Sequence, residues 1–404
     1  MKIVLFHPSL TSLGGAEMQV MEHGHLLHDH GHQVEVLTFE YDVERWHDRL
    51  PDIPVHVATR RHWTDPLSLS TVSKLVRRAR RVCLELGACD MVLAHNHPCH
   101  SMVGAGSSVP RKVWYCHEPP RALYFREAGP YMVGITEDQA RRSSVAHAVR
   151  HLLRRHDERL ASRSSTLRAK REMDQRGVAG LSLVVANSQF TADNFQRTYG
   201  TRPSSVIYPM VRMGEGGLGR LGLDRTGLHV LVQSRMELLK NQEGVIRGFA
   251  AFHRRQPSAH LHLVGEGDQR KALEILATSL LPPGAVTFHG FLPASDLAAL
   301  YRRCDVFALL PLDEPFGMVF PEAASRGLLL VGPDHGGPKE IMEGGTYGWG
   351  VDPFDPEAFA EALARIWSLP DAEVQRRREE ADAACRARYL PGVVGPQLLR
   401  ALGL

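Results

Sequence analysis

The stretch Glu314-Pro-Phe-Gly-Met-Val-Phe-Pro-Glu322 joins the apolar run Val306–Leu310 to small residues at 323–325, a pattern that predicts a strand, a loop and a helix. An ionised carboxylate accepts two hydrogen bonds at once, so each glutamate suits the vicinal hydroxyls of a sugar or ribose. The backbone N–H groups of Phe316, Gly317 and Met318 lie near the predicted helix start, where partial positive charge favours a phosphate. The stretch therefore predicts a site for a sugar, a phosphate and a ribose; the alternative is an ordinary strand–loop–helix junction.

Similar apolar runs recur along the chain and alternate with longer helical patterns such as Ala16–His30 and Ser70–Leu86. The other runs are Ile3–Phe6, Val34–Phe39, Met91–Ala94, Val113–Cys116, Leu183–Asn187, His229–Ser234, His260–Gly265, Val286–His289 and Leu328–Val331. This alternation is typical of βαβ units with a parallel sheet covered on both faces. We predict an α/β chain of two doubly wound, Rossmann-like domains that face each other across a ligand-binding cleft.

The predicted domain boundary lies where the pattern restarts. The glycine-rich stretch from Gly214 to Gly222 indicates the linker region. We expect a first domain at 1–208, a second domain at 209–384 and a C-terminal segment at about 385–404.

The composition excludes several classes of protein. The 404 residues suffice for two cores, and 43% hydrophobic with 23% charged residues is ordinary for a soluble chain. The net charge of +3 gives no reason to expect a nucleic-acid partner. No run approaches the length of a membrane span, and Met1–Pro8 lacks the features of a signal peptide. The six cysteines show no paired metal spacing, which fits a reduced, cytoplasmic protein.

Further candidate site residues follow other predicted strands. Arg235 and Lys240 can place two cations on one diphosphate, Arg as a fork and Lys as a point charge. Gly14 and Gly15 open a helix and permit close approach to a phosphate, although a plain tight turn has the same pattern. His117, after the strand Val113–Cys116, can bond a sugar hydroxyl or cap the strand end. Weaker signals of the same kind are Gly265, Phe291 and Leu292.

The stretch 141–176 is rich in arginine and has an apolar helical face. One interpretation is a basic surface that contacts an anionic lipid headgroup or a charged acceptor, peripheral at the inner membrane face. The other is a solvated helical insertion.

Together, Gly14-Gly15, His117-Glu118-Pro-Pro, Arg235 with Lys240-Asn241, Gly265-Glu-Gly and the pair Glu314 and Glu322 make one ordered set. In this order the set resembles the retaining nucleotide-sugar glycosyltransferases of family 4, which have the GT-B fold. The resemblance spans most of the chain.

The resemblance implies that the first domain lies on the acceptor side and that the second binds the nucleotide sugar. It also implies that a C-terminal helix at about 385–404 packs back on the first domain. Roles for single positions follow from it as well. Arg235 and Lys240 would hold the donor diphosphate, Glu322 the ribose, and Glu314 the donor sugar. His117 would face that sugar near the reacting centre, and Gly15 would let the first loop close on the diphosphate. The backbone of the second domain contributes through Phe316, Gly317 and Met318, and through Phe291 and Leu292 at a base edge.

The resemblance also implies an enzyme without metal or other cofactor, which moves a hexose from GDP-mannose or a UDP-hexose to an acceptor hydroxyl. The acceptor stays open between a lipid-linked glycan and a small molecule. The alternative is a nucleotide-sugar epimerase or another non-transferring enzyme of the same fold.

Overall fold

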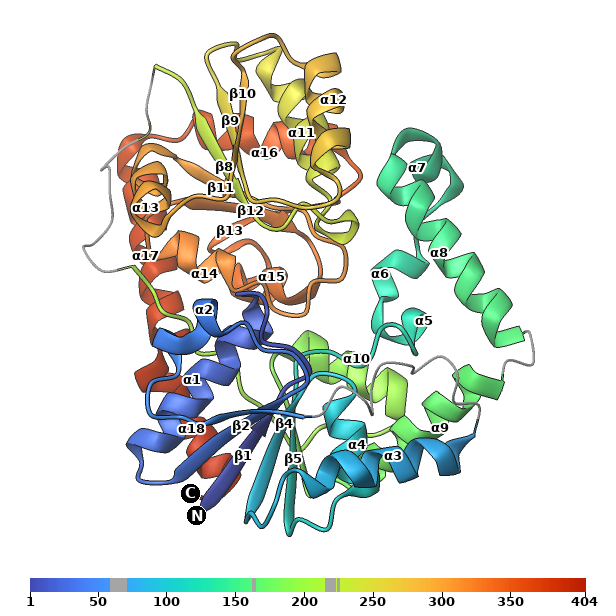
Figure 1. The fold of residues 1–404 in the computed structure, drawn as a ribbon. Helices are drawn as coiled ribbons and strands as arrows, with labels where there is room; N and C mark the ends of the chain where they lie inside the picture. The colour runs from blue at the N-terminus through green and yellow to red at the C-terminus, as the bar shows by residue number, and fades with distance from the viewer. Residues whose placement is uncertain (59–70, 162–164, 215–222, 224–225) are drawn as a thin grey trace. The chain divides into compact units, whose positions relative to one another are not determined.

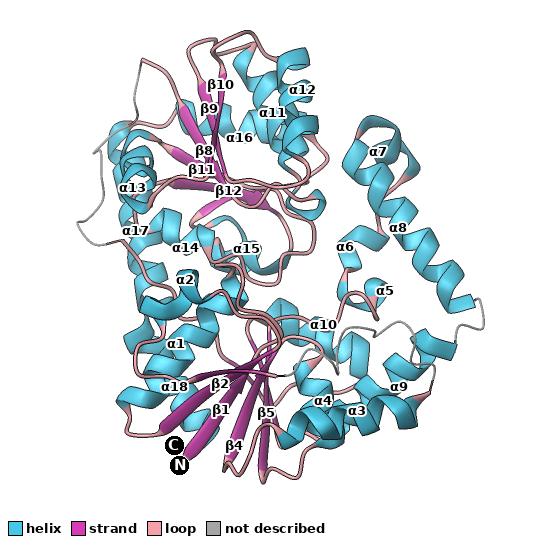
Figure 2. Ribbon diagram, viewed as in Figure 1, coloured by secondary structure: helices cyan, strands magenta, loops and turns pink. Residues whose placement is uncertain are grey.

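The computed structural model describes residues 1–58, 71–161, 165–214, 223 and 226–404. The chain divides into two compact units. Unit 1 comprises Met1–Gly129, Leu152–Met210 and Pro391–Leu404, and unit 2 comprises Pro130–His151 and Val211–Leu390. Figure 1 and Figure 2 show that each unit contains a sheet with helices packed against it.

Unit 1 is built on a parallel seven-stranded sheet with the order β3-β2-β1-β4-β5-β6-β7. Its strands are β1 Lys2–Phe6, β2 Gln33–Thr38, β3 Val55–Val57, β4 Met91–His95, β5 Arg111–Cys116, β6 Leu183–Ala186 and β7 Ser205–Val206. The strand order reverses between β1 and β4, as in the Rossmann fold, and such folds bind ligands beyond the carboxyl ends of the strands.

Both faces of this sheet are buried, because alternate residues of each strand enter different cores. Ile3 and Leu5 pack with α1 and α18, whereas Val4 and Phe6 pack with α3, α4 and α9. The helices of unit 1 are α1 Gly15–Asp29, α2 Val43–Trp46, α3 Val72–Leu84, α4 Cys99–Gly106, α5 Phe125–Ala128, α9 Ser165–Ala179, α10 Gln189–Tyr199 and α18 Pro391–Leu402.

Unit 2 is built on a parallel six-stranded sheet with the order β10-β9-β8-β11-β12-β13, again a Rossmann-like arrangement. Its strands are β8 His229–Gln233, β9 His260–Val264, β10 Val286–Gly290, β11 Val306–Ala308, β12 Leu329–Pro333 and β13 Gly348–Val351. Its helices are α6 Pro130–Val133, α7 Glu137–Arg142, α11 Gln242–His253, α12 Arg270–Leu280, α13 Ala294–Arg303, α14 Val319–Ala324, α15 Gly336–Ile341, α16 Pro356–Trp367 and α17 Asp371–Tyr389, with α8 Ser144–Ala161 shared between the units. The predicted fold class, two doubly wound Rossmann-like domains, is confirmed.

The limits of the units differ from the predicted boundaries most at one segment. Residues 130–151 were expected in the first domain but belong to unit 2. The physical reason is hydrogen bonding: Asp313 accepts the backbone N–H groups of Tyr131 and Met132, at 3.0 and 2.9 Å. Glu243 in the same way accepts the backbone N–H groups at the start of α8. The predicted linker, Gly214 to Gly222, lies almost wholly outside the described residues.

The C-terminal segment returns to unit 1 at Pro391, a few residues later than expected. α17 ends before Leu390, whose backbone is extended at φ −61° and ψ 145°. Proline suits the first position of α18, since its missing N–H has no helical partner there. Val394 and Leu398 of α18 are then buried in the core of unit 1.

Two general properties complete the fold. All six cysteines are free thiols, and all but Cys89 are buried. No helix in the described part of the chain combines the length and the apolar character that crossing a membrane requires.

Candidate functional site

The loop after β11 brings two of the predicted residues together. Lys240 Nζ lies 2.6 Å from Glu314 Oε2, and their side chains are 26% and 17% exposed. The two residues are 74 positions apart in the sequence. Lys240 follows β8 and Glu314 follows β11, and these two strands are neighbours in the sheet. A charge-assisted hydrogen bond of this length holds both side chains in place in a partly solvated site.

The backbone of this loop is held by buried polar groups and glycines. Asp313 is fully buried and has a positive φ of 50°, which a residue other than glycine seldom adopts. Its carboxylate accepts the backbone N–H groups at the start of α6. On the other side, Gly337 N donates to Glu314 O at 2.9 Å, and a Cβ on Gly337 would lie 2.3 Å from Phe316 Cα. The loop therefore needs glycine at 337 and an acceptor at 313 to hold Glu314 in this position.

Arg235 lies at the end of β8 but does not join the pair of Lys240 and Glu314. Its guanidinium is 64% exposed and lies 2.7 Å from Glu237. The neighbouring backbone is close-packed, because a Cβ on Gly265 would lie 2.0 Å from Ser234 O and Gly265 has a φ of 127°. Gly265 is thus explained by the close approach of two strand ends, and its contact with a donor stays a prediction.

Glu322 lies in the first turn of α14 and is partly buried. Burial raises the pKa of its carboxyl to about 7, although the positive charge of Arg326 opposes the shift. Arg326 Nη1 donates to Glu322 O at 2.8 Å, and its guanidinium lies over the ring of Tyr301, 4.8 Å from the centroid. A carboxyl with a pKa near 7 is protonated in part of the molecules at neutral pH, so it can either donate to or accept from a hydroxyl.

The three residues expected to offer backbone N–H groups lie directly before α14. Phe316 is itself a core residue, 2% exposed, and its ring meets Tyr389 edge to face at 5.2 Å. Gly317 has a φ of 91° and accepts from Phe320 N, while Met318 is the N-terminal cap of α14. Their contact with a phosphate stays a prediction.

The predicted base-edge residues follow β10, at the edge of the unit 2 sheet. Phe291 is 81% exposed, and Leu292 is partly exposed. An exposed aromatic ring at a strand end is available for stacking on a base, so this prediction keeps its physical basis.

Gly14, Gly15 and His117 belong to unit 1. α1 begins at Gly15, and a Cβ on Gly14 would lie 2.5 Å from Glu17 Oε2. Glu17 also accepts from Ser12 Oγ at 3.1 Å. The start of this helix therefore already has a carboxylate beside it, which opposes a phosphate there unless Glu17 moves.

His117 follows β5 and is buried, with 8% of its surface exposed. Its Nε2 lies 3.0 Å from His95 Nδ1, and Thr191 Oγ1 donates to its backbone carbonyl at 3.1 Å. Burial, with the nearby His7 and His23, holds the pKa of His117 well below its ordinary value. The ring is therefore neutral at physiological pH and bonds hydroxyls as an uncharged group.

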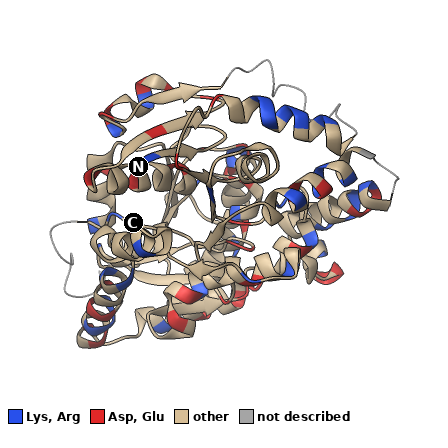
Figure 3. Ribbon diagram, turned by 90° about the horizontal axis from the view of Figure 1, so that it is seen from below, with Lys and Arg blue, Asp and Glu red and all other residues tan. Residues whose placement is uncertain are grey.

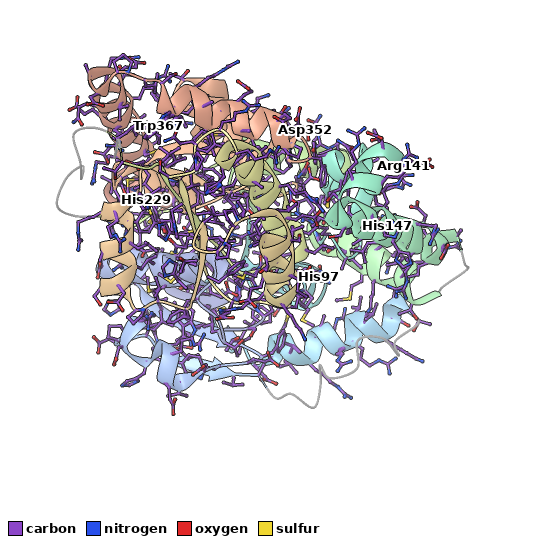
Figure 4. All side chains as sticks on the ribbon, turned by 90° about the horizontal axis from the view of Figure 1, so that it is seen from above. His97, Arg141, His147, His229, Asp352 and Trp367 are labelled. Atoms are coloured by element: carbon purple, nitrogen blue, oxygen red, sulfur yellow. The ribbon has the colours of Figure 1, made fainter. Side chains whose placement is uncertain are left out.

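Sequence reasoning missed several residues that shape the Glu314 loop. Tyr131 stacks on His335 with centroids 3.8 Å apart, and its hydroxyl donates to Asp352 Oδ1 at 2.7 Å. Figure 4 labels Asp352 among the side chains. His335 precedes the glycine pair that packs on the loop, and its buried Nε2 has no hydrogen-bond partner among the described residues. No local motif marks Tyr131, because its partners lie more than 180 residues away along the chain.

One group of side chains among the described residues has the spacing of metal ligands, namely His97, His100 and Asp174 in unit 1. Figure 4 labels His97. Hydrogen bonds account for this group: Asp174 Oδ1 accepts from His100 Nε2 at 2.9 Å and from Ser101 Oγ at 2.5 Å. Asp174 Oδ2 accepts from the Tyr199 hydroxyl at 2.7 Å. The arrangement fits a buried hydrogen-bond network that ties α9 to α4 and α10.

The basic stretch 141–176 is divided between the units at residues 151 and 152. Figure 3 shows Lys and Arg together with Asp and Glu on the helices of the molecule. Several of its arginines have acidic partners: Arg141 and Arg142 pair with Asp138, Arg150 with Glu137, Arg154 with Glu158, Arg171 with Glu127 and Arg176 with Glu172. Much of the positive charge is therefore balanced locally, and Arg163 lies outside the described residues.

Two Rossmann-like units in one chain are the architecture of the GT-B glycosyltransferases, and solved glycosyltransferase structures share this fold. A family sequence model described as Glycosyltransferase Family 4 matches residues 13–214, half of the chain. A second, described as Glycosyl transferases group 1, matches residues 220–384. The chain belongs to glycosyltransferase family 4.

Curated relatives match only part of the chain. A D-inositol 3-phosphate glycosyltransferase of Thermomonospora curvata is 30% identical over 241 residues, 54% of this chain and 55% of the relative. A mannosylfructose-phosphate synthase of Agrobacterium fabrum is 34% identical over 139 residues, 32% of this chain and 31% of the relative. The chain thus spans about half the length, or less, of these relatives.

Solved structures share the fold over the full chain. The Anabaena protein HepE in complex with UDP-glucose has a TM-score of 0.69 and 22% identity, covering 100% of this chain and 99% of that one. WaaG, a glycosyltransferase involved in lipopolysaccharide biosynthesis, has a TM-score of 0.67 and 16% identity, covering 100% of both chains. At these identities the likeness establishes the fold.

Proposed function

We propose that this chain is a retaining hexosyltransferase that works without a bound metal and moves a hexose from a nucleoside diphosphate sugar to an acceptor hydroxyl. The observation that carries the proposal is the contact of 2.6 Å between Lys240 and Glu314, within the residues that the Glycosyl transferases group 1 model matches. An ammonium group has three donors, so Lys240 can keep Glu314 and still bond a phosphate oxygen. The pair thus offers a cation to the leaving diphosphate and an acceptor to the sugar hydroxyls.

The remaining predicted residues each have a separate role in this proposal. Arg235 is exposed and, with Lys240, supplies the second positive charge for the diphosphate. Glu322 bonds the ribose hydroxyls, and the neutral ring of His117 bonds a hydroxyl of the donor sugar. The two cations stabilise the charge that develops as the diphosphate leaves, which is the role that a metal ion has in other enzymes.

The donor and acceptor are proposed as short lists. Family membership favours retention of the anomeric configuration. For the donor we propose GDP-mannose or a UDP-hexose; the relatives include a mannosylfructose-phosphate synthase, and HepE has been solved with UDP-glucose. For the acceptor we propose a lipid-linked glycan or a small molecule. Among small molecules, the names of the D-inositol 3-phosphate glycosyltransferases suggest a phosphorylated cyclitol as one candidate.

Thermal unfolding with UDP, GDP, ADP or dTDP tests the donor site directly. A ligand that binds only the folded state at 100 times its Kd adds about 2.7 kcal/mol, so the matching nucleotide should raise the Tm clearly. Lys240→Met should remove most of that rise. Lys271→Met, at an exposed lysine of α12 outside the motifs, should keep it. No rise with any nucleotide, or an equal rise in Lys240→Met, contradicts the proposed site.

The stereochemistry needs a separate measurement. NMR of the first product formed from the matching nucleotide sugar should show the anomeric configuration of the donor. An inverted product would contradict retention while leaving the nucleotide site intact.

We further propose a cytoplasmic protein that contacts an anionic acceptor or the inner membrane face through α8 and α9. The support is the exposure of Arg154, Arg155 and Arg159. Replacing all three with Ser should weaken binding to anionic vesicles or use of a charged acceptor, at about 1 kcal/mol per charge. The effect should fade as salt rises, and nucleotide binding should not change. Unchanged vesicle binding and acceptor kinetics would identify the stretch as a solvated insertion.

A further inference from the structure

Three buried histidines form a continuous chain of ring contacts in unit 1. His117 Nε2 lies 3.0 Å from His95 Nδ1, and His95 Nε2 lies 3.4 Å from His23 Nδ1. Their exposed fractions are 8%, 0% and 1%. His95 therefore has an imidazole neighbour at each of its two nitrogens, and the chain ends at His117.

The fold brings these residues together from three elements. His95 is the last residue of β4 and pairs in register with Tyr115 of β5, so that His117 follows at the same edge of the sheet. His23 lies on the buried face of α1. The ring of Tyr115 packs against all three histidines, at 4.6 to 5.7 Å, but its hydroxyl donates to Ile207 O and takes no part in the chain.

The three rings are uncharged at physiological pH. Burial lowers the pKa of His23 to about 3, and it holds the pKa of His95 and of His117 well below the ordinary value. A neutral imidazole has one N–H donor and one acceptor nitrogen, so every contact along the chain needs the correct tautomer on both sides.

Only two arrangements satisfy both contacts. In the first, every ring carries its proton on Nδ1, so His23 donates to His95, and His95 donates to His117. In the second, every ring carries its proton on Nε2 and the direction reverses. His117 Nδ1 is consequently an N–H donor in the first arrangement and an acceptor in the second.

That nitrogen is the one left for a ligand. Among the residues that the structure describes, the hydrogen bond found for the His117 ring joins its Nε2 to His95 Nδ1, which leaves Nδ1 for another partner. We propose that His95 and His23 are positioning residues that set whether His117 Nδ1 donates to, or accepts from, the hydroxyl it meets. This inference rests on the proposed function in one respect, namely that the hydroxyl belongs to the donor sugar.

His95 acts on His117 by fixing the orientation and the tautomer of its ring, and no charged imidazole is involved. His95 fixes the ring plane of His117 by taking its Nε2, as second-layer partners do for histidines that bind ligands. His23 then biases His95. Removing His95 frees both nitrogens of His117 to exchange tautomers, so only part of the population presents the correct group to the sugar.

Nitrogen-15 NMR of histidine-labelled protein tests the tautomer directly, without substrate. The His117 signals are those lost in His117→Gln. In the wild type they should report a single tautomer, and in His95→Leu they should move toward the average of the two. His95→Gln should restore the single tautomer, because an amide can accept from one neighbour and donate to the other. His117 signals that are unchanged in His95→Leu would overturn the proposal.

Kinetics with the matching nucleotide sugar give a second readout. Losing one hydrogen bond to a reacting group corresponds to about tenfold in rate, so kcat should fall about tenfold in His95→Leu and recover within about threefold in His95→Gln. His23→Leu should cause a smaller fall, and His28→Leu, at an exposed position of the same helix, none. The Tm rise with the matching nucleotide should persist in all of these variants.

The two proposals fail in different ways. If His117→Gln keeps full turnover, the role of His117 toward the donor sugar is wrong, whatever the NMR shows. If His117→Gln is impaired while the His95 variants match the wild type in tautomer and in kcat, the positioning role of His95 is wrong and the proposed function stands.

Discussion

Glu322 gives a prediction whose sign and size follow from the structure. Burial raises the pKa of its carboxyl from 4.5 to about 7 in the folded protein. Between these two values the folded state keeps a proton that the unfolded state has lost, so the stability of unit 2 falls as pH rises from 4.5 to 7. Above pH 7 the loss of stability is complete, and below pH 4.5 there is no loss of stability from this group.

The size follows from the shift. A change from 4.5 to about 7 corresponds to ~3 kcal/mol, and because Glu322 keeps some contact with solvent we take this as the upper end. Glutamine has nearly the same shape and never ionises. Glu322→Gln should therefore be more stable than the wild type at pH 8, by ~1–3 kcal/mol, and this advantage should shrink toward pH 5.

The assay is urea unfolding at several pH values between 5 and 8, with hydrogen exchange in peptides of unit 2 as the readout. Glu373→Gln is the matched control, because its arginine partners lower the pKa of Glu373 to about 2. Glu373 is then largely ionised from pH 5 to 8 in both the folded and the unfolded protein. The stability difference between Glu373→Gln and the wild type should therefore hardly vary with pH. A difference between Glu322→Gln and the wild type that stays constant from pH 5 to 8 would refute the buried, proton-holding carboxyl.

The same substitution separates stability from function. If Glu322 binds the ribose hydroxyls, Glu322→Gln should weaken binding of the matching nucleoside diphosphate even where it stabilises the fold. Affinity of the wild type relative to the variant should rise between pH 6 and 8, as the carboxylate forms. Equal affinities over this range would leave the stability result in place and remove the ribose assignment.

Three further outcomes are expected. Lys240→Met should lower kcat/KM by an amount equivalent to ~2–4 kcal/mol with little change in Tm, and turnover near that of the wild type would show that Lys240 does not meet the leaving group. Activity should survive excess EDTA; a complete loss that magnesium or manganese restores would show that a metal is needed. Asp313→Ala should raise the KM for the nucleotide sugar and cost ~1–3 kcal/mol of stability, because two buried N–H groups of α6 lose their acceptor, and normal values of both would show that this contact does not hold the Glu314 loop.

The fold could be predicted from the sequence because buried parallel strands are continuous apolar runs. All the strands proposed from such runs are present, with ends within two residues of the expected positions. The strands β3, β7 and β13 were missed. β3 and β7 have only three and two residues, and β13 has glycine at two of its four positions, so none shows an apolar run that a pattern can detect.

The candidate site could be predicted only where one strand end supplies it. Glu314 and Lys240 each follow an apolar run within a few residues, so both can be found from the sequence pattern. The adjacency of β8 and β11 then brings them into contact. The contact of His95 with His117 depends on the register between two strands, and three isolated histidines carry no sign of it. The same holds for Tyr131, whose stacking on His335 requires a fold that joins residues 204 positions apart.

The segment 130–151 shows why a boundary drawn from sequence periodicity differs from a boundary drawn from physical contacts. Periodicity assigns these residues to the first domain, since they precede its last strands. Two buried carboxylates of unit 2, Asp313 and Glu243, nevertheless accept the backbone N–H groups that begin two of its helices. A buried carboxylate without donors is costly, so the segment and the second sheet stabilise each other. Because Asp313 directly precedes Glu314, the same contact that defines the unit also holds the residue proposed to bind the donor sugar.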